Sequence, residues 1–390
     1  MTQRLAIVAS HPVQYHAPWF RNLAAQPGLD VEVLFGHYAS GREQAQAGFG
    51  VEFDWDIPLL DGYAHRFLTN VASQPSVNTF RGVDTPTVTQ VLRQGHFDAV
   101  LVLGWHTRAY WQAIQACWRE GRAVMARSDS HLHQERPLLT RLAKELPYRY
   151  FISRLDACLP VGIWSRDYFL HYGARPERTF LVPHSAAVPP EARQPSALRL
   201  AGREAWNLPS SALVCLLAGK LIPQKCPLDF VRAIAQASQT SALVGLVAGD
   251  GPLREETVRL AQELNAPVRF AGFLNQSEMC RAYAAADVLV LPSSHESWGL
   301  VANEAMAWGL PCVVSDIVGC GPDLVEDGVT GFTVSLHDIE ALATTLTLLS
   351  DAPTARVAMS QNARNRIAHF TPQVATEGVV QAMAAIRGGT

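Results

Sequence analysis

Two carboxylates, Glu296 and Glu304, lie on either side of a glycine within residues 289–307. This stretch reads as a buried strand, a sharp loop and a helix that begins near Gly299. Backbone N–H groups at such a helix start can bind an anion, because they lack partners within the helix and the helix dipole is positive there. Glu304 lies about five residues into the helix, on the order of 7 Å along its axis, roughly the step from a diphosphate to its ribose. Glu296 would face the other end of the same ligand.

Two lysines follow the first strand expected in the second half of the chain. Lys220 and Lys225 lie on the loop after that strand, so both ammonium groups can converge on a diphosphate. The next expected strand ends in Gly249 and Gly251, a turn that opens a helix. This turn is not a dinucleotide fingerprint, because the third glycine would stand at position 254, which is arginine. The loops therefore predict phosphate binding by cations and backbone groups, with no metal at the site.

Polar residues also follow the strands expected in the first half. His11 and His16 follow the first strand, His106 the third, and Asp129 and His131 the fourth. Ligands of parallel α/β sheets bind at the carboxyl ends of the strands, so these side chains are candidates for a second binding site. The alternative for each histidine is a structural role, such as capping a helix or bonding a neighbouring loop.

Short apolar runs alternate with amphipathic runs along the chain, which is typical of parallel sheets wrapped by helices. Residues 36–86 break this rhythm and read as an irregular insertion, while residues 188–197, with three prolines, read as a linker. The expected strands are Leu5–Ala9, Val31–Phe35, Ala99–Leu103, Val124–Arg127, Ala157–Pro160, Thr179–Val182, Leu213–Ala218, Ala242–Ala248, Val268–Phe270, Val288–Leu291, Cys312–Ser315 and Phe332–Val334.

Composition narrows the class of protein. The 390 residues, 48% of them hydrophobic, suffice for two packed cores, and a net charge of -3 argues against a protein that coats nucleic acid. The seven cysteines are scattered without a Cys-x-x-Cys pair, which indicates reduced thiols and a cytoplasmic protein. The first apolar run is too short for a signal peptide, and no run approaches the length of a membrane span.

The motifs of the second half resemble those of the retaining nucleotide-sugar glycosyltransferases of family four, also called glycosyl transferases group 1. That family has Glu-x-Phe-Gly followed by a second Glu, and this chain has Glu296-Ser-Trp-Gly and Glu304. Trp298 replaces the usual Phe, Lys220 stands where Arg is usual, and the usual Gly-Gly turn after the first strand is absent. The resemblance is dense from about residue 213 to 334 and sparse before it.

The resemblance implies the GT-B fold, an α/β architecture of two Rossmann-like, doubly wound parallel-sheet domains facing across a cleft. It implies an acceptor-binding domain at residues 1–190 and a nucleotide-sugar domain at 198–370. Residues 371–390 would form a helix that crosses back to the first domain.

The resemblance also implies roles for individual residues. His106 would contact the donor sugar near the reacting carbon, Glu296 would orient the sugar, and Glu304 would hold the ribose. The expected catalytic set is His106, Glu296, Lys220 and Lys225. The expected donor-binding set is Lys220, Lys225, Gly249, Gly251, Phe273, Leu274, Glu296, Ser297, Trp298, Gly299, Leu300, Val301 and Glu304. The expected acceptor-binding set is His11, His16, Asp129 and His131.

The expected reaction moves a hexosyl group from a nucleotide-diphosphate sugar to a hydroxyl, with retention of configuration and without metal. UDP-sugar is the favoured donor and GDP-sugar the alternative; no cofactor is expected. Three rivals stay open: a retaining glycosidase, a two-domain sugar-nucleotide epimerase, and an inactive nucleotide-sugar binding module of the same fold. The acceptor, a saccharide, lipid-linked saccharide or small molecule, stays open too.

Residues 136–154 combine basic and aromatic residues that suit peripheral contact with an anionic membrane, or else form a packed helix with a solvated basic side.

Overall fold

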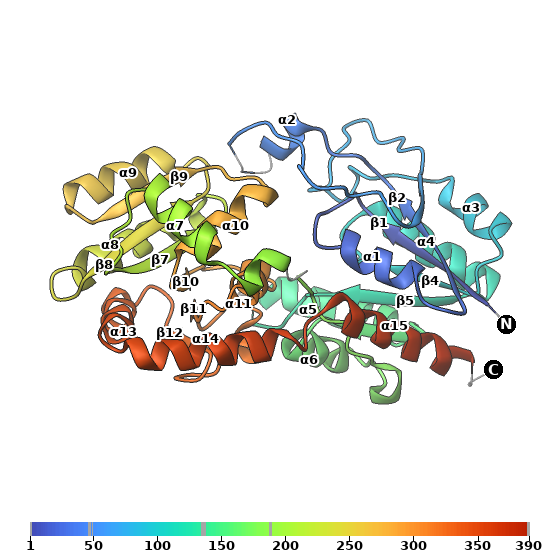
Figure 1. Ribbon diagram of the computed structural model, residues 1–390. Helices are drawn as coiled ribbons and strands as arrows, with labels where there is room; N and C mark the ends of the chain where they lie inside the picture. The colour runs from blue at the N-terminus through green and yellow to red at the C-terminus, as the bar shows by residue number, and fades with distance from the viewer. Residues whose placement is uncertain (1, 46–47, 49, 134–137, 187–188, 388–390) are drawn as a thin grey trace. The chain divides into compact units, whose positions relative to one another are not determined.

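The computed structural model describes residues 2–45, 48, 50–133, 138–186 and 189–387 (Figure 1). The chain divides into two units. The first comprises Met1–Glu43, Pro58–Ser185 and Thr371–Thr390, and the second comprises Gln44–Ile57 and Ala186–Phe370. Each unit is an α/β structure built around one parallel sheet.

The first unit contains a six-stranded parallel sheet in the order β3-β2-β1-β4-β5-β6. Its strands are β1 (Gln3–Ala9), β2 (Leu29–Phe35), β3 (Ala64–Phe67), β4 (Ala99–Val102), β5 (Ala123–Ser128) and β6 (Ala157–Pro160). Its helices are α1 (Ala17–Ala24), α3 (Val88–Gln94), α4 (Arg108–Glu120), α5 (Leu138–Ile152), α6 (Ile163–His171) and α15 (Pro372–Arg387), while α2 (Gly41–Gln44) ends at the unit boundary. The central strands are apolar and buried because helices cover both faces of the sheet.

The last helix, α15, packs into the core of the first unit. Val379 and Met383 are buried in the same cluster as Trp19 and Phe20 of α1. A Cβ at Gly378 would lie 2.1 Å from the Leu181 carbonyl oxygen, so this position admits only glycine without a backbone shift. The close approach anchors the carboxyl-terminal helix.

The second unit contains a six-stranded parallel sheet in the order β12-β11-β10-β7-β8-β9. Its strands are β7 (Leu213–Ala218), β8 (Leu243–Ala248), β9 (Val268–Gly272), β10 (Val288–Leu291), β11 (Cys312–Ser315) and β12 (Gly331–Val334). Its helices are α7 (Ser196–Ala205), α8 (Pro227–Ala237), α9 (Arg254–Glu263), α10 (Gln276–Ala285), α11 (Leu300–Ala307), α12 (Gly321–Leu324), α13 (Ile339–Asp351) and α14 (Pro353–Ile367), with short 3-10 turns that include η4 (Pro223–Lys225).

Both sheets have the same topology. Numbered from its own first strand, each sheet has the order 3-2-1-4-5-6 of a doubly wound fold. The order reverses between β1 and β4 in the first unit and between β7 and β10 in the second. The predicted fold class is therefore confirmed, and each unit offers a ligand position at the carboxyl ends of these strand pairs.

Three local predictions were wrong. Residue 188 of the expected linker lies outside the described residues, and 189–197 contain the 3-10 turn η3 (Pro190–Arg193) and the start of helix α7. Ion pairs of 2.6 and 2.7 Å from Arg199 and Arg203 to Asp287 hold α7 in the second unit. The expected strand Thr179–Val182 is not a regular strand, although it runs beside β6. Thr179 forms an isolated bridge with Cys158, and the Phe180 and Val182 N–H groups donate to the Cys158 and Pro160 carbonyls at 3.0 and 2.9 Å. The 36–86 segment was predicted to be irregular, but it includes the edge strand β3. All four residues of β3 are exposed, so the sequence has no apolar run there that would indicate a strand.

Residues 44–57 were assigned from the sequence to the amino-terminal domain, but they cluster with the second unit. The Asn275 side-chain amide donates to the Asp54 carbonyl at 2.8 Å, and the Ser277 backbone N–H donates to Asp56 at 3.2 Å. The rings of Phe53 and Phe273 pack with their centroids 4.4 Å apart. This segment therefore covers the loop that follows β9.

Candidate functional site

Lys225 and Glu296 form an ion pair at the carboxyl ends of β7 and β10. The Lys225 Nζ donates to Glu296 Oε1, and the Ser293 hydroxyl donates to the same oxygen at 3.4 Å. Burial lowers the pKa of Lys220, the charge of Lys225 lowers it further, and Glu296 partly opposes both effects. The structure thus brings together two cations and one carboxylate, all predicted from the sequence, at the point where the strand order reverses.

Backbone contacts fix the loop that carries Glu296. The Gly319 N–H donates to the Glu296 carbonyl at 3.2 Å, and the Cys320 N–H donates to the Trp298 carbonyl at 2.8 Å. A Cβ at Gly319 would lie 1.9 Å from the Ser297 carbonyl oxygen, so only glycine permits this approach. Ser297 therefore contributes backbone packing to the loop.

Helix α11 begins at Leu300, as the sequence predicts, with Gly299 as its N-cap in the left-handed region at φ 101°. Gly299 has no side chain that could cap this end of the helix. Leu300 and Val301 are half-buried in the first turn. Trp298 points inward instead: it is 4% exposed, and its indole N–H donates to Asn303 at 2.7 Å. Its side chain thus supports the helix start from within the core.

Replacing Gly299 by alanine is expected to lower the free energy of unfolding by about 2–3 kcal/mol. Alanine is strained in the left-handed backbone conformation of this position, and its added Cβ would crowd neighbouring side chains. A Cβ at this position would lie 3.0 Å from Leu291 Cδ2 and 3.3 Å from Val318 Cγ1. Gly272→Ala is the matched control, because φ is +74° there but no atom lies within 4 Å of the added Cβ. Urea denaturation of both variants measures the difference, and equal losses would contradict the packing argument.

Glu304 lies further along α11 in a separate hydrogen-bonded cluster. Its carboxylate accepts hydrogen bonds from the Gln276 amide at 3.2 Å and from the Tyr283 hydroxyl. Burial raises the pKa of Glu304, although both hydrogen bonds act in the opposite direction. Sequence reasoning missed Gln276 and Tyr283, which lie on α10. They orient the carboxylate that was predicted to hold a ribose.

The glycine turn after β8 packs tightly on the loop that carries Lys220. A Cβ at Gly249 would lie 1.8 Å from the Gly219 carbonyl oxygen, and the Leu221 N–H donates to the Asp250 carbonyl at 2.8 Å. A Cβ at Gly251 would lie 2.8 Å from the Leu221 carbonyl oxygen. Gly249 and Gly251 therefore let two loops approach each other at the predicted phosphate site.

Residues of the 44–57 segment lie against the same loops. A Cβ at Gly48 would lie 3.4 Å from Lys220 Cδ, and one at Gly50 would lie 3.2 Å from the Gly251 backbone nitrogen. Phe273, predicted to bind donor, packs against Phe53, and the adjacent Leu274 is half-buried. The sequence carried no signal for Gly48 and Gly50, because the segment is distant along the chain and lacks regular periodicity.

The first unit contains a cavity of about 330 Å³ at the carboxyl ends of β1, β4 and β5. Four predicted residues line it, His11, His16, His106 and Asp129. His131 does not line it: its ring lies 5.2 Å from that of Trp164. The cavity wall also includes Ser10, Tyr15, Tyr110, Arg127, Ser128, Ser130 and His184.

Arg127 and His184, which sequence reasoning missed, form a buried pair on the cavity wall. The Arg127 guanidinium donates to the Val182 carbonyl at 3.0 Å and to His184 Nδ1 at 3.3 Å. The His184 Nε2 lies 3.8 Å from Asp129 Oδ2. Burial lowers the pKa of Arg127 to about 10, so it stays charged at neutral pH. Both residues lie close to the ends of expected strands, but this position in the sequence does not reveal that they pair.

The neighbouring groups set the charge of the cavity. Burial and then the Arg127 charge lower the pKa of His184 to about 4. Burial also lowers the pKa of His11 to about 4. Desolvation alone would raise the pKa of Asp129, but His184 and Arg127 outweigh it and hold that pKa below its ordinary value. At neutral pH the cavity therefore holds one balanced Arg–Asp pair beside uncharged imidazoles.

The free energy of unfolding is expected to fall as the pH drops from about 6.5 to about 4. Above pH 6.5, His184 is neutral in both the folded and the unfolded state. Between these pH values the His184 imidazole takes up a proton in the unfolded chain, whereas burial keeps it neutral in the folded chain. The loss from His184 alone is about 3 kcal/mol, at about 1.4 kcal/mol per pKa unit. Urea midpoints measured across this window test the expectation. His184→Gln, which keeps an acceptor for Arg127, should flatten the profile, and an unchanged slope would contradict it.

Comparisons with known proteins agree with this architecture. Residues 200–366 match the family model described as glycosyl transferases group 1. A D-inositol 3-phosphate glycosyltransferase of Saccharomonospora viridis is 35% identical over 234 residues, 56% of this chain and 53% of the relative. One of Streptomyces griseus is 40% identical over 167 residues, 40% of this chain and 35% of the relative. The chain thus spans about half the length, or less, of these curated relatives.

Solved structures share the fold at low sequence identity. HepE of Anabaena, in complex with UDP, has a TM-score of 0.75 at 18% identity, covering 98% of this chain and 100% of its own. Sucrose-phosphate synthase of Thermosynechococcus elongatus has a TM-score of 0.72 at 19% identity and covers all of both chains.

The two doubly wound units define a protein of the GT-B glycosyltransferase fold. Residues 200–366 match the glycosyl transferases group 1 family and resemble its curated relatives, so the recognition made from the sequence motifs is confirmed for this part of the chain.

Proposed function

We propose that the protein transfers a hexosyl group from a nucleoside-diphosphate sugar to an acceptor hydroxyl, with retention of configuration and without a metal in the reaction. The observation that carries this proposal is the cluster of Lys220, Lys225 and Glu296 beside the start of α11, where the N-cap residue is a glycine. Cations and helix N–H groups suit a diphosphate leaving group, while the carboxylate suits sugar hydroxyls.

In this reaction the bond between the sugar C1 and the β-phosphate oxygen breaks, and a bond from C1 to the acceptor oxygen forms on the same face. The departing diphosphate takes the acceptor proton, so no protein nucleophile is assigned. Lys220 and Lys225 would stabilise the negative charge that gathers on the diphosphate. Glu296, already held by Lys225 and Ser293, would orient the sugar ring. His106, which lines the first-unit cavity, keeps its predicted role as a contact of the sugar.

UDP is the favoured nucleotide of the donor. Structures of the Anabaena HepE neighbour hold UDP, and one holds UDP and glucose, which supports this choice by analogy of fold. Thermal-shift titration with UDP, GDP and ADP distinguishes the bases, because a ligand of the folded state raises the melting temperature. We expect the largest shift with UDP; a larger shift with GDP would move the assignment to the alternative donor.

The first-unit cavity is the proposed acceptor site. Its charges balance at neutral pH, and its imidazoles, hydroxyls and carboxylate offer both donors and acceptors, so it suits an uncharged hydroxyl-rich group. The proposed contacts are His11, His16 and Asp129; His131, which packs on Trp164, is the weakest of the four predicted contacts.

An assay of sugar release tests the proposed reaction against its rivals. Radiolabelled UDP-sugars are incubated with and without a panel of saccharide, lipid-linked and small-molecule acceptors. A transferase gives acceptor-dependent product with retained anomeric configuration by NMR. An epimerase would change the donor sugar without acceptor, a glycosidase would hydrolyse a glycoside, and an inactive module would bind donor without turnover; each of these results would overturn the proposal.

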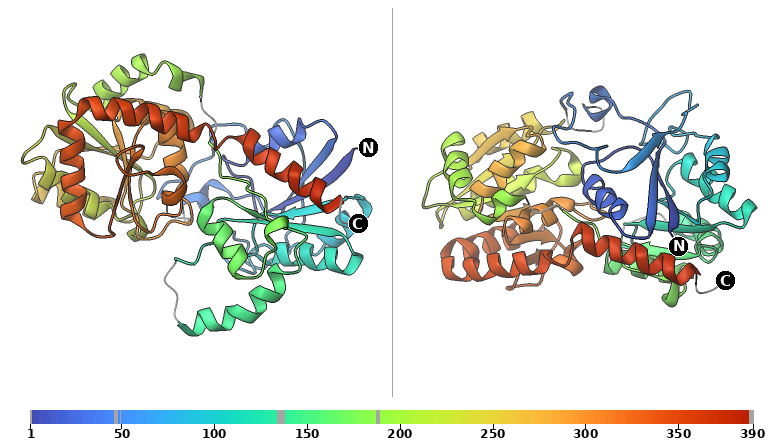
Figure 2. Two further views of the ribbon diagram at one scale, coloured as in Figure 1. Left: turned by 90° about the horizontal axis from the view of Figure 1, so that it is seen from below. Right: turned by 45° about the vertical axis from the view of Figure 1, so that its right-hand side comes forward.

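Contact with an anionic membrane surface is a further part of the proposal. The amino-terminal half of α5 projects from the first-unit sheet (Figure 2, left) and exposes Leu139, Leu142 and Leu146, which are 80%, 63% and 77% exposed. Basic residues on the same helix, including Lys144 and Arg149, complement anionic lipid. Arg136 lies outside the described residues. Within the described part of the chain, no helix is both long and apolar enough to span a bilayer.

Vesicle co-sedimentation tests this contact. Binding to phosphatidylglycerol vesicles, but not to phosphatidylcholine vesicles, is expected, and Leu142→Ser with Leu146→Ser should abolish it. Val357→Ser on α14, where the valine is 72% exposed, is the matched control. Equal binding by wild type and the double variant would contradict the contact.

We place the reaction in the cytoplasm, since all seven cysteines are free thiols.

A further inference from the structure

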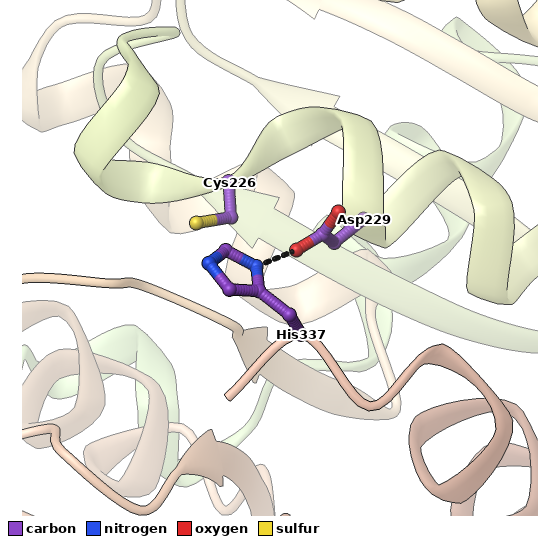
Figure 3. Close-up of side chains that lie close together, drawn as sticks. All are labelled: Cys226, Asp229 and His337. Atoms are coloured by element: carbon purple, nitrogen blue, oxygen red, sulfur yellow. Dashed lines mark hydrogen bonds and ion pairs between the residues drawn. The ribbon is translucent and has the colours of Figure 1, made fainter. Parts of the chain in front are cut away.

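Three side chains with different metal-binding groups meet in the second unit (Figure 3). They are Cys226 at the start of α8, Asp229 one turn along the same helix, and His337 in the loop between β12 and α13. One candidate ligand atom from each residue lies within 4.8 Å of the other two. The cluster includes none of the residues assigned to donor or acceptor.

Local structure holds these groups on one side of α8. Cys226 is the N-cap of α8 and Asp229 lies in its first turn, and their candidate ligand atoms lie within 4.8 Å of each other. The chain reaches this helix through Cys226 in the left-handed region at φ 48°, and His337 is also left-handed at φ 63°. Such values are uncommon outside glycine. These backbone conformations occur where the Cys226 thiol and the His337 imidazole come together from segments that are distant in sequence.

The imidazole is oriented by a carboxylate. His337 Nδ1 and Asp229 Oδ2 are 2.6 Å apart, and the other ring nitrogen lies on the side of the Cys226 sulfur (Figure 3). This contact places the imidazole and the carboxylate within reach of one ion, which both can bind once the hydrogen bond between them is exchanged for the metal. The Cys226 residue is buried, whereas the His337 side chain is 59% exposed, so an ion could enter from the solvent side of the imidazole.

We propose that Cys226, Asp229 and His337 form a zinc-binding site that joins the start of α8 to the β12–α13 loop. One sulfur, one nitrogen and one oxygen ligand suit zinc, which accepts all three types in tetrahedral geometry. Calcium and magnesium prefer all-oxygen sites, so the thiol disfavours them. A water molecule would complete the tetrahedron.

Small movements complete this geometry. Tetrahedral zinc with bonds of about 2.0–2.3 Å places its ligand atoms about 3.3–3.8 Å apart, so the widest separation must close by about 1 Å. The Cys226 thiol proton passes to solvent as the thiolate–zinc bond forms. Asp229 exchanges its hydrogen bond with His337 for the metal. It also pairs with Arg232, whose Nη1 lies 3.2 Å from Oδ1, and this cation competes with zinc.

The position of the site suggests an effect on the donor loop. Cys226 directly follows Lys225, so zinc would hold the end of the η4 turn against the loop that carries His337. This consequence rests on the proposed function, because it matters only if Lys225 binds donor. Metal binding itself does not depend on that function.

Cobalt(II) titration of the full chain, followed by absorption spectroscopy, tests the site directly. We expect one cobalt per chain, with the visible bands of a tetrahedral ion and a near-ultraviolet thiolate charge-transfer band, both removed by added zinc. Cys226→Ser should abolish the charge-transfer band, and Asp229→Asn and His337→Asn should each weaken binding at least 10-fold. Arg232→Ala should tighten binding, because the competing cation is gone.

Controls keep the test independent of folding and activity. Cys280→Ser removes a half-buried thiol and His369→Asn an exposed imidazole, and both should titrate like wild type. Zinc should raise the melting temperature of wild type but not of Cys226→Ser, with circular dichroism confirming the fold of each variant. No charge-transfer band in wild type, or a band that survives in Cys226→Ser, would overturn the proposal.

The same variants separate this inference from the proposed reaction. In Cys226→Ser, EDTA should leave sugar transfer within about twofold, because the reaction itself needs no metal. Abolished transfer in that background would contradict the metal-free reaction and leave the cobalt result intact. A failed cobalt titration with normal transfer would remove the zinc site alone.

Discussion

Replacing Lys225 by alanine is expected to lower kcat for sugar transfer about 10²- to 10³-fold. The ammonium group pairs with Glu296 beside the start of α11, where the leaving diphosphate would gather charge. Removing one preorganised positive group from such a position typically costs this much. The loss should fall mainly on kcat, because the charge on the leaving group develops in the transition state.

Steady-state kinetics of Lys225→Ala, Lys225→Arg and Arg259→Ala measure this effect. Arg259 is the matched control, since its side chain is 66% exposed on α9. Lys225→Arg should restore part of the rate, because a guanidinium also binds phosphate. Unchanged melting temperatures separate a catalytic loss from unfolding, and a near wild-type kcat in Lys225→Ala would contradict the assigned role.

Replacing Glu304 by alanine is expected to lower kcat/KM by at least about 100-fold, mainly through weaker donor binding. Hydrogen bonds to a charged group contribute about 1.5–3 kcal/mol each, and a ribose offers two hydroxyls to this carboxylate. The Gln276 and Tyr283 contacts hold the carboxylate in place before donor arrives. The effect should therefore exceed that of a surface carboxylate.

Two further variants isolate the charge of Glu304. Glu304→Gln keeps the shape and one acceptor for Tyr283 or Gln276, so the fold should survive while donor affinity falls. Tyr283→Phe removes one orienting contact and should cost about tenfold in donor affinity or less. Titration calorimetry with UDP gives each affinity. Near wild-type rates in both Glu304→Ala and Lys225→Ala would defeat the site assignment in the second unit.

The strands of the second unit and the loops that carry Glu296, Lys220 and Lys225 were predicted correctly, because each strand and the loop after it are contiguous in the chain. The β10 strand, the Glu296 loop and the α11 start are contiguous, and one apolar run followed by Gly299 marks their order. Lys220 and Lys225 follow the apolar run of β7 in the same way. The strands β7 and β10, and the charged residues that follow them, could therefore be predicted without knowing any tertiary contact.

Features that depend on distant contacts could not be predicted. Strand β3 is exposed and pairs at a sheet edge, so its residues carry no apolar period. Helix α7 follows a proline-rich stretch and is fixed by the ion pairs with Asp287. Residues 44–57 join the second unit through Asp54 and Phe53, which no local pattern marks.

The first-unit cavity was predicted in part. His11, His16, His106 and Asp129 come directly after strands and line the cavity as the strand-end rule implies. Arg127 was assigned to a strand, and its role becomes visible only when His184 is brought to it from 57 residues away. Long-range pairing, which sequence patterns do not encode, completes this site.

Calorimetric titration of UDP into wild type and Lys225→Ala shows whether the loop that carries Lys225 binds the diphosphate of the donor. We expect saturable binding of one UDP per chain in wild type and at least 10-fold weaker binding in Lys225→Ala, because free UDP already carries the charge that the diphosphate gains as it leaves. Both proteins should be folded. The absence of UDP and GDP binding to wild type, or equal UDP affinities in the two proteins, would contradict diphosphate binding by this loop.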